Sequence, residues 1–353
     1  MDSSSKEMNY NALISVIVPA FQAQDTLGKC IISILSQSYR KLECLIVVDG
    51  ATDNTDSIAR GFARDDSRVR VIHQKNLGRS AARNNGVLNA HGDWIMFVDA
   101  DDYLIPGAIE ILVSGIGDKT DIVYGNYRTT NGNCPDCSGE AGEFDLSLPK
   151  RANLNIEQLE LSQYNCSYAF DTYNCRTCWA KLYAVSILKK DILPFPEDIR
   201  IGEDTYMNYR TLKLARCVTY IDLPIYMYND SSTGTVRTWS VKDYSSIINL
   251  SERIQLACMN DSEYRLDLMA FLSRDYLGVF GRSSRYSRLV QMHKVCSLAK
   301  NACTDFIYKS LPVYLTQRRT IRNVYNNMRI WFIRHNWFLA AYFLQRIGGG
   351  IFR

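Results

Sequence analysis

The sequence predicts an α/β protein with a mostly parallel central sheet covered by helices on both faces, followed by a helical C-terminal region. Between about residues 12 and 127, near-continuous apolar runs alternate with segments of helical periodicity, the pattern of a buried parallel sheet. From about Val241 onward strand signals disappear, and apolar residues such as Tyr244 and Ile247 recur at helical spacing. At 353 residues, the chain can hold one large domain or two modest ones.

The elements of the first half alternate regularly along the chain. The predicted strands are Ile14–Val18, Leu42–Val48, Arg68–Ile72, Trp94–Val98 and Asp121–Tyr127. The predicted helices between them are Thr26–Ser36, Asn54–Arg64 and Gly78–Ala90. A further helix is expected to start at Pro106, because proline suits the first turn of a helix.

The second half begins with residues 129–150, whose Asn, Gly and Pro content predicts an irregular insertion. The elements predicted after it are helices Ile156–Tyr164 and Asp204–Leu214, with strands Trp179–Tyr183, Cys217–Ile221 and Ile225–Tyr228. We expect the α/β body to span residues 1–235, with one half over about 12–127 and the other over about 150–235, and a helical region over 236–353.

Charge is distributed unevenly along the chain. The net charge is +4, but Phe306–Arg353 contains one Lys and seven Arg with no Asp or Glu, so these 48 residues carry about +8 and the rest about −4. The N-terminal segment Met1–Glu7 lacks the apolar stretch of a signal peptide, and no apolar run approaches the length of a membrane span. We therefore expect a cytoplasmic protein.

Eleven cysteines in a chain without an export signal indicate reduced thiols rather than a disulfide framework. Two Cys-x-x-Cys pairs, Cys134/Cys137 and Cys175/Cys178, could together close a tetrahedral zinc site. The 37 residues between the pairs exceed the usual spacing of zinc ribbons, and a strand is predicted directly after the second pair. Structural zinc is therefore the less favoured alternative.

An acidic cluster follows the apolar run Trp94–Val98. Asp99, Asp101 and Asp102 place three carboxylates within four residues at the carboxyl end of a predicted strand, where open α/β sheets bind ligands. Carboxylates so close together repel one another unless a cation lies among them, and Mg²⁺ and Mn²⁺ prefer such oxygen ligands together with a substrate diphosphate. The alternative is a solvated acidic turn ahead of the next helix.

Two further segments carry polar groups at strand ends. Asp49 directly follows the strand Leu42–Val48, and Gly50 would let the backbone approach a ligand closely, so Asp49 could accept hydrogen bonds from a base or a sugar. The segment Asn76–Gly86 places Arg79 and Arg83 near a helix N-terminus, a combination that suits a diphosphate. Helix capping around Asp53 and solvated surface arginines are the respective alternatives.

Taken together, these motifs resemble the ordered series of family-2 glycosyltransferases with the GT-A fold. The motifs are Pro19-Ala20-Phe21, Asp49–Thr55, Asn76–Gly86, Asp99–Asp102, Trp179–Tyr183, and Phe195-Pro196 followed by Gly202-Glu203-Asp204. The resemblance covers about residues 12–230. A single Asp-x-Asp is a weak signal, whereas this many motifs in the family's order and spacing form a strong one.

The resemblance implies a donor site. It assigns donor binding to Pro19, Phe21, Asp49, Asn76, Gly78, Arg83 and Asp99. Pro19 and Phe21 would line the nucleobase pocket, and Asp49 would hydrogen-bond a uracil-type base. Asp99 would bind the ribose, and Asp101 would hold the Mn²⁺ or Mg²⁺ that bridges the diphosphate.

The resemblance also implies an acceptor side. Asp102, Trp179 and Lys181 would lie toward the acceptor, and Asp204 of the Glu203-Asp204 pair would be the general base. Direct displacement at an anomeric carbon needs such a base and a cation that stabilises the leaving diphosphate, and it would invert the configuration. The alternative for Glu203-Asp204 is a cap for the helix that follows.

The chain departs from the family's pattern at several positions. Gln22 and Gln24 stand where the family often has Asn and Glu, and Ala51 stands where Ser is usual. Asn229-Asp230 follows Tyr226-Met227-Tyr228, where a His or Arg often reaches the metal; Arg237 is left without a role. These changes bear on the nucleobase contacts and the last metal ligand.

The resulting expectation is a non-processive, inverting transferase that moves one sugar from a UDP-sugar to a glycan or lipid-linked acceptor in surface polysaccharide synthesis. Arg237-Thr238-Trp239 lacks the Gln of the processive Gln-x-x-Arg-Trp motif. The alternatives are a metal-dependent nucleotidyltransferase, against which the lack of a Gly-rich phosphate loop speaks, and a catalytically dead zinc-stapled or membrane-recruiting scaffold.

The basic tail has two interpretations. Apolar residues recur there at helical spacing: Ile321, Tyr325, Met328, Phe332, Leu339 and Tyr342. With Trp331, Trp337 and the arginines, such a helix suits the interface of an anionic membrane at the inner face of the cell. A core-packing helix with solvated arginines fits equally, while nucleic acid is not expected because no binding module accompanies the charge.

Overall fold

The computed structural model divides the chain into two compact units. It describes residues 11–130, 156–160, 177–190, 193–229, 240–260, 265–287, 289–309, 311 and 323–348. The first unit comprises Met1–Glu197 and Met207–Ser231 and contains every described strand; the second comprises Asp198–Tyr206 and Ser232–Arg353 and is helical.

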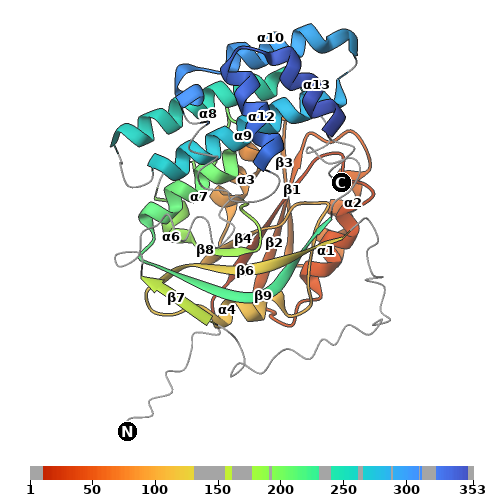
Figure 1. The fold of residues 1–353 in the computed structure, drawn as a ribbon. Helices are drawn as coiled ribbons and strands as arrows, with labels where there is room; N and C mark the ends of the chain where they lie inside the picture. Colours follow the sequence, from red (N-terminus) through yellow and green to blue (C-terminus); the bar gives the residue numbers. More distant parts are fainter. Residues whose placement is uncertain are drawn as a thin grey trace. The chain divides into compact units, whose positions relative to one another are not determined.

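The described strands form one mixed sheet of the order β3-β2-β1-β4-β8-β6-β9-β5, with β7 paired to β9 (Figure 1). The strands are β1 Ile14–Ala20, β2 Leu42–Asp49, β3 Val69–Gln74, β4 Trp94–Phe97, β5 Tyr103–Leu104, β6 Thr120–Thr130, β7 Ile156–Glu160, β8 Lys181–Ala184 and β9 Cys217–Asn229. Strands β1 to β4 are parallel, whereas β8 is antiparallel to both β4 and β6. This confirms the predicted α/β class with a mostly parallel sheet.

The helices of the first unit cover both faces of the parallel part. They are α1 Leu27–Leu35, α2 Thr55–Asp65, α3 Arg79–Asn89, α4 Ala108–Ser114 and α6 Val185–Leu188, together with most of α7 Glu203–Leu214. Helices α1 and α2 lie next to each other (Figure 1). Side chains alternate along β1, and Val16 and Val18 point to the face where they share a core cluster with residues of α1 and α2. Ile17 points the other way, toward α3, where a Cβ on Gly86 would lie only 2.4 Å from it. The glycine lets α3 approach the sheet closely.

One predicted helix was wrong. Residues Ile156–Glu160 form strand β7, which pairs antiparallel with β9 from Ile156 opposite Ile221 to Glu160 opposite Cys217. Glu, Gln and Leu favour a helix locally, but the backbone groups of β9 offer a partner that no local pattern reveals, and such pairing overrides weak propensity. The predicted strands Cys217–Ile221 and Ile225–Tyr228 are one strand, β9, with irregular register against β6.

Two smaller differences concern the acidic turn and the following helix. Helix α4 begins at Ala108 rather than at Pro106, after Gly107 in the left-handed region (φ 78°). The two-residue strand β5, Tyr103–Leu104, was not predicted; it pairs with Met227 and Tyr226 of β9 and so ties the acidic turn to that strand.

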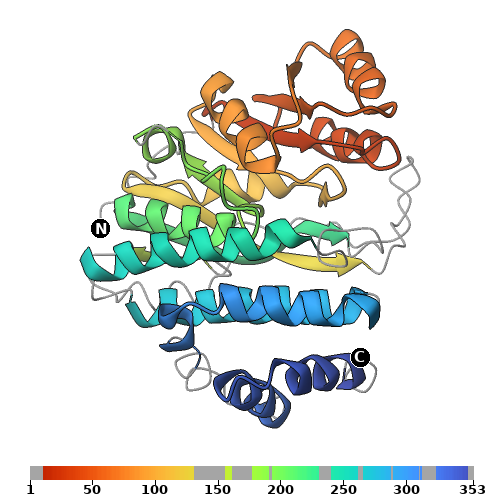
Figure 2. The same cartoon turned by 90° about the horizontal axis from the view of Figure 1, so that it is seen from above.

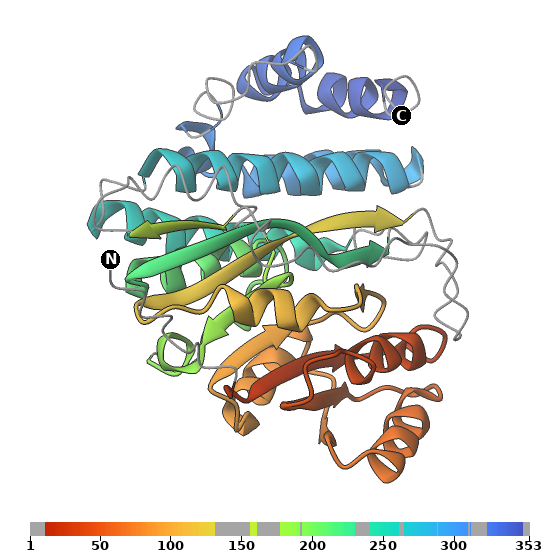
Figure 3. The ribbon, with the colours of Figure 1, turned by 90° about the horizontal axis from the view of Figure 1, so that it is seen from below.

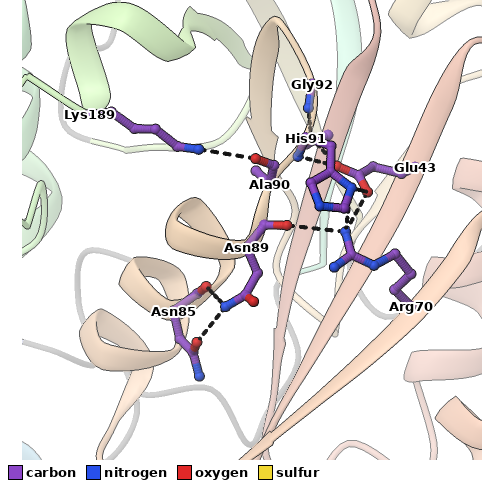
Figure 4. A network of polar contacts seen from close by, with 9 residues as sticks. Glu43, Arg70, Asn85, Asn89, Ala90, His91, Gly92 and Lys189 are labelled. Carbon is purple, nitrogen blue, oxygen red and sulfur yellow. Dashed lines mark hydrogen bonds and ion pairs between the residues drawn. The ribbon is translucent and has the colours of Figure 1, made fainter.

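A buried carboxylate joins the amino-terminal ends of the parallel strands (Figure 4). Glu43 of β2 accepts hydrogen bonds from Ser15 Oγ at 2.6 Å, from the His91 amide at 2.7 Å and from Arg70 Nη1 at 2.8 Å. Burial opposes ionisation, but these hydrogen bonds and the charge of Arg70 outweigh it and lower the pKa of Glu43. The edge of the sheet opposite the acidic turn is therefore held by one ionised group.

Replacing Glu43 by Gln is expected to lower the free energy of unfolding by about 1.5–3 kcal/mol near pH 7, because bonds to a charged acceptor are lost. Since the pKa of Glu43 is depressed in the folded state, its contribution is present above the unfolded-state pKa and is lost as the pH falls through the folded-state pKa. The difference between wild type and Glu43→Gln in urea titrations should thus shrink in acid. The exposed Asp65→Asn serves as the control and should show little effect at either pH.

The second unit is a set of packed helices. They are α8 Val241–Asn260, α9 Arg265–Tyr286, the 3-10 turn η3 Leu289–Gln291, α10 Met292–Ala302, α12 Asn323–Arg334 and α13 Phe338–Gly348. Figure 2 shows α8 and α9 alongside each other; Tyr244 and Ser283 hydrogen-bond between them at 2.6 Å. Tyr276 of α9 donates to the carbonyl of Ala299 at the next interface. The predicted helical C-terminal region is confirmed, and no helix in the described ranges is long and apolar enough to span a bilayer.

The tail is two helices rather than one continuous stripe. Chain direction changes between α12 and α13 at Asn336, which has a φ of 59°, and the Trp337 amide donates to the carbonyl of Phe332 (Figure 3). Of the residues expected on one face, Tyr342 is buried whereas Met328 and Leu339 are exposed. Because of this turn, the apolar residues of α13 do not continue the face formed by the apolar residues of α12.

Candidate active site

Three loops meet at the carboxyl edge of the parallel strands. β1 lies between β2 and β4, and the register sets Ala20 beside Val48 and Ile17 beside Phe97. The segments after these strands, which carry Phe21, Asp49 and Asp99, therefore leave the sheet at one edge. The strand order reverses at β1, so this edge is the topological switch point where ligands bind in open α/β sheets.

The loop after β1 is joined to the loop after β2 by side-chain hydrogen bonds. Gln22, which has a φ of 50°, accepts a hydrogen bond from the Thr52 amide at 2.8 Å, and Gln24 accepts one from the Asn54 amide at 3.2 Å. Phe21 precedes Gln22 in the same loop and is 48% exposed, so its apolar ring is in contact with solvent. The two departures from the family's pattern thus hold the loop that the resemblance assigns to the nucleobase.

Asp49 organises the loop that leads into α3. Its Oδ1 accepts from Gln74 Nε2 and the Leu77 amide, both at 2.8 Å, and its Oδ2 accepts from the Gly78 amide at 2.9 Å. Gly50 has a φ of 65°, and a Cβ there would lie 2.6 Å from the Asn76 amide nitrogen. A carboxylate has about four acceptor sites, so three internal bonds still leave capacity for a ligand donor.

Helix α3 starts at this loop and carries the predicted arginine. Gly78 precedes α3 and has a φ of 95°. It has no side chain, so it cannot cap the first backbone amides of the helix. Arg83 is 2% exposed and its Nη2 contacts Asp99 Oδ1 at 2.8 Å. Its guanidinium also lies 5.3 Å from the centre of the Phe195 ring.

The Phe195-Pro196 motif is fixed to the same helix. Asn84 of α3 donates from Nδ2 to the carbonyl of Phe195 at 2.8 Å and accepts from the Phe195 amide at 3.0 Å. The two bonds clamp the Phe195 backbone from both sides. The motif therefore lies next to Arg83, which in turn contacts Asp99.

The acidic turn is held by Tyr226 and Asn229 of β9. Tyr226 Oη accepts a hydrogen bond from the Asp99 amide at 3.1 Å and donates to Asp102 Oδ2 at 2.6 Å. The Asn229 amide donates to Asp102 Oδ1 at 2.8 Å, and Asn229 Nδ2 donates to the carbonyl of Asp101 at 3.1 Å. Asn229, the position at which the chain departs from the family, thus supports the turn itself.

The electrostatics of the turn are strongly negative. Burial, and next the charge of Asp99, raise the pKa of Asp101 to about 6. Burial and then the charges of Asp99 and Asp101 raise the pKa of Asp102 as well. Asp102 is bound by Tyr226 and Asn229 and Asp99 by Arg83, so Asp101 is the carboxylate of this turn that best fits a metal ion.

A stack of aromatic rings adjoins the turn through Tyr226. The Trp179 ring lies parallel to Tyr226 with centroids 4.6 Å apart, it stacks on Tyr228 at 5.7 Å, and Tyr127 meets it edge-on at 4.9 Å. Only Trp179 was predicted as a site residue. The Tyr226-Met227-Tyr228 repeat, which points two rings to one face of a strand, was the signal that could have identified Tyr226 and Tyr228.

Lys181 has an internal position. It is 2% exposed, and its Nζ donates to the carbonyls of Thr177 at 2.7 Å and Trp179 at 3.1 Å. Its ammonium also lies 5.0 Å from the centre of the Tyr124 ring. The structure thus places Lys181 where it fixes the turn that presents Trp179, while its predicted place on the acceptor side stays a prediction.

Glu203 and Asp204 form the first turn of α7. Glu203 is 2% exposed and Asp204 is partly exposed. Both belong to the segment Asp198–Tyr206, which groups with the helical unit. Gly202 before them has a φ of 86°, and its carbonyl accepts from the Tyr206 amide, which closes this first turn.

The zinc alternative falls mainly outside the described residues. Cys134, Cys137 and Cys175 lie outside them, as does Arg237, and the side chain of Cys178 is fully buried. Within the ranges described, no group of three or more His, Cys, Asp or Glu side chains is arranged to hold a metal ion.

Comparisons with known proteins agree with this architecture. The sequence profile of Glycosyl transferase family 2 matches residues 15–171. Glycosyltransferase GlyG of Streptococcus pneumoniae is 31% identical over 231 residues, which cover 64% of this chain and 73% of GlyG. Glycosyltransferase GlyA of the same organism is 33% identical over 69% of this chain, but the match spans only 34% of GlyA.

A solved structure shows the same fold over nearly the whole chain. The structure of S. aureus TarS 1–349 in complex with UDP-GlcNAc superposes with a TM-score of 0.64 at 17% identity, covering 97% of this chain and 93% of TarS 1–349. The expected GT-A fold is thereby confirmed. The chain belongs to glycosyltransferase family 2, which decides against a nucleotidyltransferase.

Replacing Tyr226 by Phe is expected to weaken donor binding, because the hydroxyl that joins the Asp99 amide to Asp102 is lost. Leaving these buried groups without their partner typically costs about 1–3 kcal/mol of stability. Tyr183→Phe is the matched control: it also removes a buried hydroxyl, one that donates to Asn208 at 2.7 Å. Both variants should lose stability, but only Tyr226→Phe should reduce UDP affinity in calorimetry with Mn²⁺. Equal UDP affinities would count against a role for Tyr226 at the site.

Proposed function

We propose that this protein is a non-processive, inverting glycosyltransferase that moves a single sugar from a UDP-sugar to a hydroxyl of a glycan or lipid-linked acceptor in surface polysaccharide synthesis. The observation that carries the proposal is the acidic turn Asp99–Asp102, held at the switch point of the sheet by Tyr226 and Asn229. Membership in family 2 supplies the reaction class.

The donor would lie across the loops after β1, β2 and β4. Pro19 and the exposed Phe21 would contact the nucleobase, with Asp49 accepting from it. Binding of UDP-GlcNAc by TarS, whose fold is similar, supports a UDP-linked donor. The diphosphate would be bound near Asn76 and Gly78, where the amides of α3 begin, with Arg83 beside it.

A divalent cation, Mn²⁺ or Mg²⁺, would supply charge neutralisation of the departing diphosphate. Asp101 would hold it, and the raised pKa of Asp101 reflects the same concentration of negative charge that a cation would relieve. Such hard cations commonly take one or two carboxylates and complete their shell with substrate phosphate oxygens and water.

The acceptor hydroxyl would be deprotonated by Asp204, with Glu203 beside it. In a direct displacement, the acceptor oxygen bonds to the anomeric carbon as the bond to the diphosphate breaks, and the acceptor's proton passes to the base. Attack opposite the leaving group inverts the configuration. Trp179, with its stacked tyrosines, and Asp102 would border the acceptor side, since sugars pack well on aromatic rings.

The Asp101→Ala variant tests the donor site. We expect it to fold normally and to lose the increase in UDP affinity that Mn²⁺ or Mg²⁺ gives the wild type, because Asp101 would no longer bind the cation. Isothermal titration with UDP, with and without each metal, measures this; the exposed Asp65→Ala is the control. Metal-dependent UDP binding retained by Asp101→Ala would refute the assignment. A protein that binds zinc by elemental analysis but neither binds nor hydrolyses UDP-sugars would instead be the scaffold alternative.

The enzyme would work peripherally on the cytoplasmic face of the membrane. The side chains of Ile330 and Ile333 in α12 and of Tyr342 in α13 are buried, whereas Trp331 of α12 and Trp337, in the turn between the helices, are 49% and 56% exposed. These two rings contact each other with centroids 5.6 Å apart. The tail thus has both a packed face and an exposed aromatic face, and its excess of arginine suits anionic lipids.

The double variant Trp331→Ala/Trp337→Ala should bind vesicles of phosphatidylcholine and phosphatidylglycerol more weakly than wild type in co-sedimentation. Wild-type binding should also fall between low and high salt, because each basic residue near the surface contributes about 1 kcal/mol that salt screens. Leu88→Ala/Leu256→Ala removes two equally exposed apolar side chains elsewhere and should leave binding unchanged. If the unmodified protein binds neither anionic nor neutral vesicles, membrane association is disproved.

A further inference from the structure

The segment that carries Glu203 and Asp204 is anchored on the helical unit. Residues 198–206 group with helices α8 and α9 rather than with the sheet, although they interrupt the first unit in sequence. Ile199 at the start of the segment is 1% exposed. The helical unit therefore includes the residues that precede α7 and those that begin it.

Helix α8 holds this segment with side chains spaced along a single face. Ser246 Oγ accepts hydrogen bonds from the amides of Arg200 at 2.8 Å and Ile201 at 2.9 Å. One turn further, Asn249 Nδ2 donates to the carbonyl of Asp198 at 3.2 Å, and Arg253 pairs with the Asp198 carboxylate at 2.7 Å. Positions 246, 249 and 253 lie at the spacing that aligns side chains on a helix.

Close packing fixes the turn that follows. A Cβ on Gly202 would lie 2.6 Å from Leu250 of α8 and 2.8 Å from Asp275 Oδ2 of α9, so a side chain there would be excluded even without the positive φ. Asp275 is paired with Arg274 at 2.9 Å, and Arg274 reaches Thr205 Oγ1 at 3.5 Å. Helices α8 and α9 thus pack against the backbone of Gly202, two residues before Asp204.

We propose that Ser246 is a positioning residue for catalysis: by accepting two successive backbone amides, its hydroxyl holds the segment that presents the general base. The inference rests on the proposed role of Asp204. A base must come within about 2.6–3.2 Å of the proton it removes. A misplacement of about 1 Å, even one that originates away from the reacting atoms, can cost on the order of 10²-fold in rate.

The Ser246 hydroxyl is placed for this purpose rather than for helix packing alone. Ser246 is 2% exposed, and its hydroxyl oxygen accepts hydrogen bonds from two amides of residues 198–206, which lie outside α8. Ser251 lies on the same helix, is equally buried, and directs its hydroxyl to Thr304 at 3.2 Å instead. Ser246 and Ser251 therefore form a matched pair that differs in what the hydroxyl contacts.

The experiment compares Ser246→Ala, Asn249→Ala, Ser251→Ala and Asp204→Asn in the full-length protein. Turnover is followed as UDP release from UDP-GlcNAc, UDP-glucose or UDP-galactose, whichever the wild type uses fastest. Ser246→Ala should lower kcat on the order of 10- to 100-fold with unchanged KM for the donor. Asn249→Ala should act in the same direction, Ser251→Ala should leave kcat unchanged, and Asp204→Asn should lose on the order of 10²- to 10⁴-fold.

Hydrogen exchange provides a readout that is independent of activity. Peptides covering residues 198–206 should exchange faster in Ser246→Ala, which loses the acceptor of two amides, and not in Ser251→Ala. Identical kcat and exchange in the two serine variants would overturn the proposal while an inactive Asp204→Asn leaves the base assignment standing. Faster exchange in Ser246→Ala with a wild-type kcat would also overturn it. Full turnover by Asp204→Asn would instead show that the proposed base, and with it the purpose of the segment, is wrong.

Discussion

The site depends on the repulsion among three carboxylates in one turn and on the groups that hold them there. Burial, and next the mutual repulsion of these carboxylates, raises the pKa values of Asp101 and Asp102, so Asp99, Asp101 and Asp102 cannot all be ionised at low cost. Tyr226 and Asn229 bind Asp102 from β9, and Arg83 from α3 binds Asp99. These restraints come from strand β9 and helix α3, which are far apart along the chain, so the fold must be complete before the turn has this shape.

The parallel half of the sheet was predictable from sequence because its strands are buried on both faces and its helices alternate with them. The same logic located the acidic turn and Asp49, since carboxyl ends of parallel strands meet at one edge. Strand β7 could not be predicted, because its stability comes from pairing with β9, about sixty residues away along the chain. The roles of Gln22 and Asn229 were hidden for a similar reason: the side chain of each bonds to a backbone group of a distant loop.

Positions that depart from the family's pattern are used differently here rather than left idle. Gln22 and Gln24 carry uncharged side-chain amides whose oxygens accept hydrogen bonds from the backbone of the loop after β2. The side chain of Asn229 donates to the carbonyl of Asp101, whereas its bond to Asp102 comes from the backbone amide, which any residue except proline would provide. Sequence motifs identify the class of site, but side-chain partners decide how its parts are held.

In the proposed function, the two compact units would supply different parts of the reaction. The donor and metal ligands would come from strand ends of the first unit, where backbone register fixes their spacing, whereas the segment with Asp204 is bound by Ser246, Asn249 and Arg253 of the second. Helix α7 begins in the second unit and continues in the first, so the residues of this one helix are shared between the two units. If Asp204 is the base, a change in α8 would alter its position, because the amides of residues 200 and 201 have their acceptor on that helix.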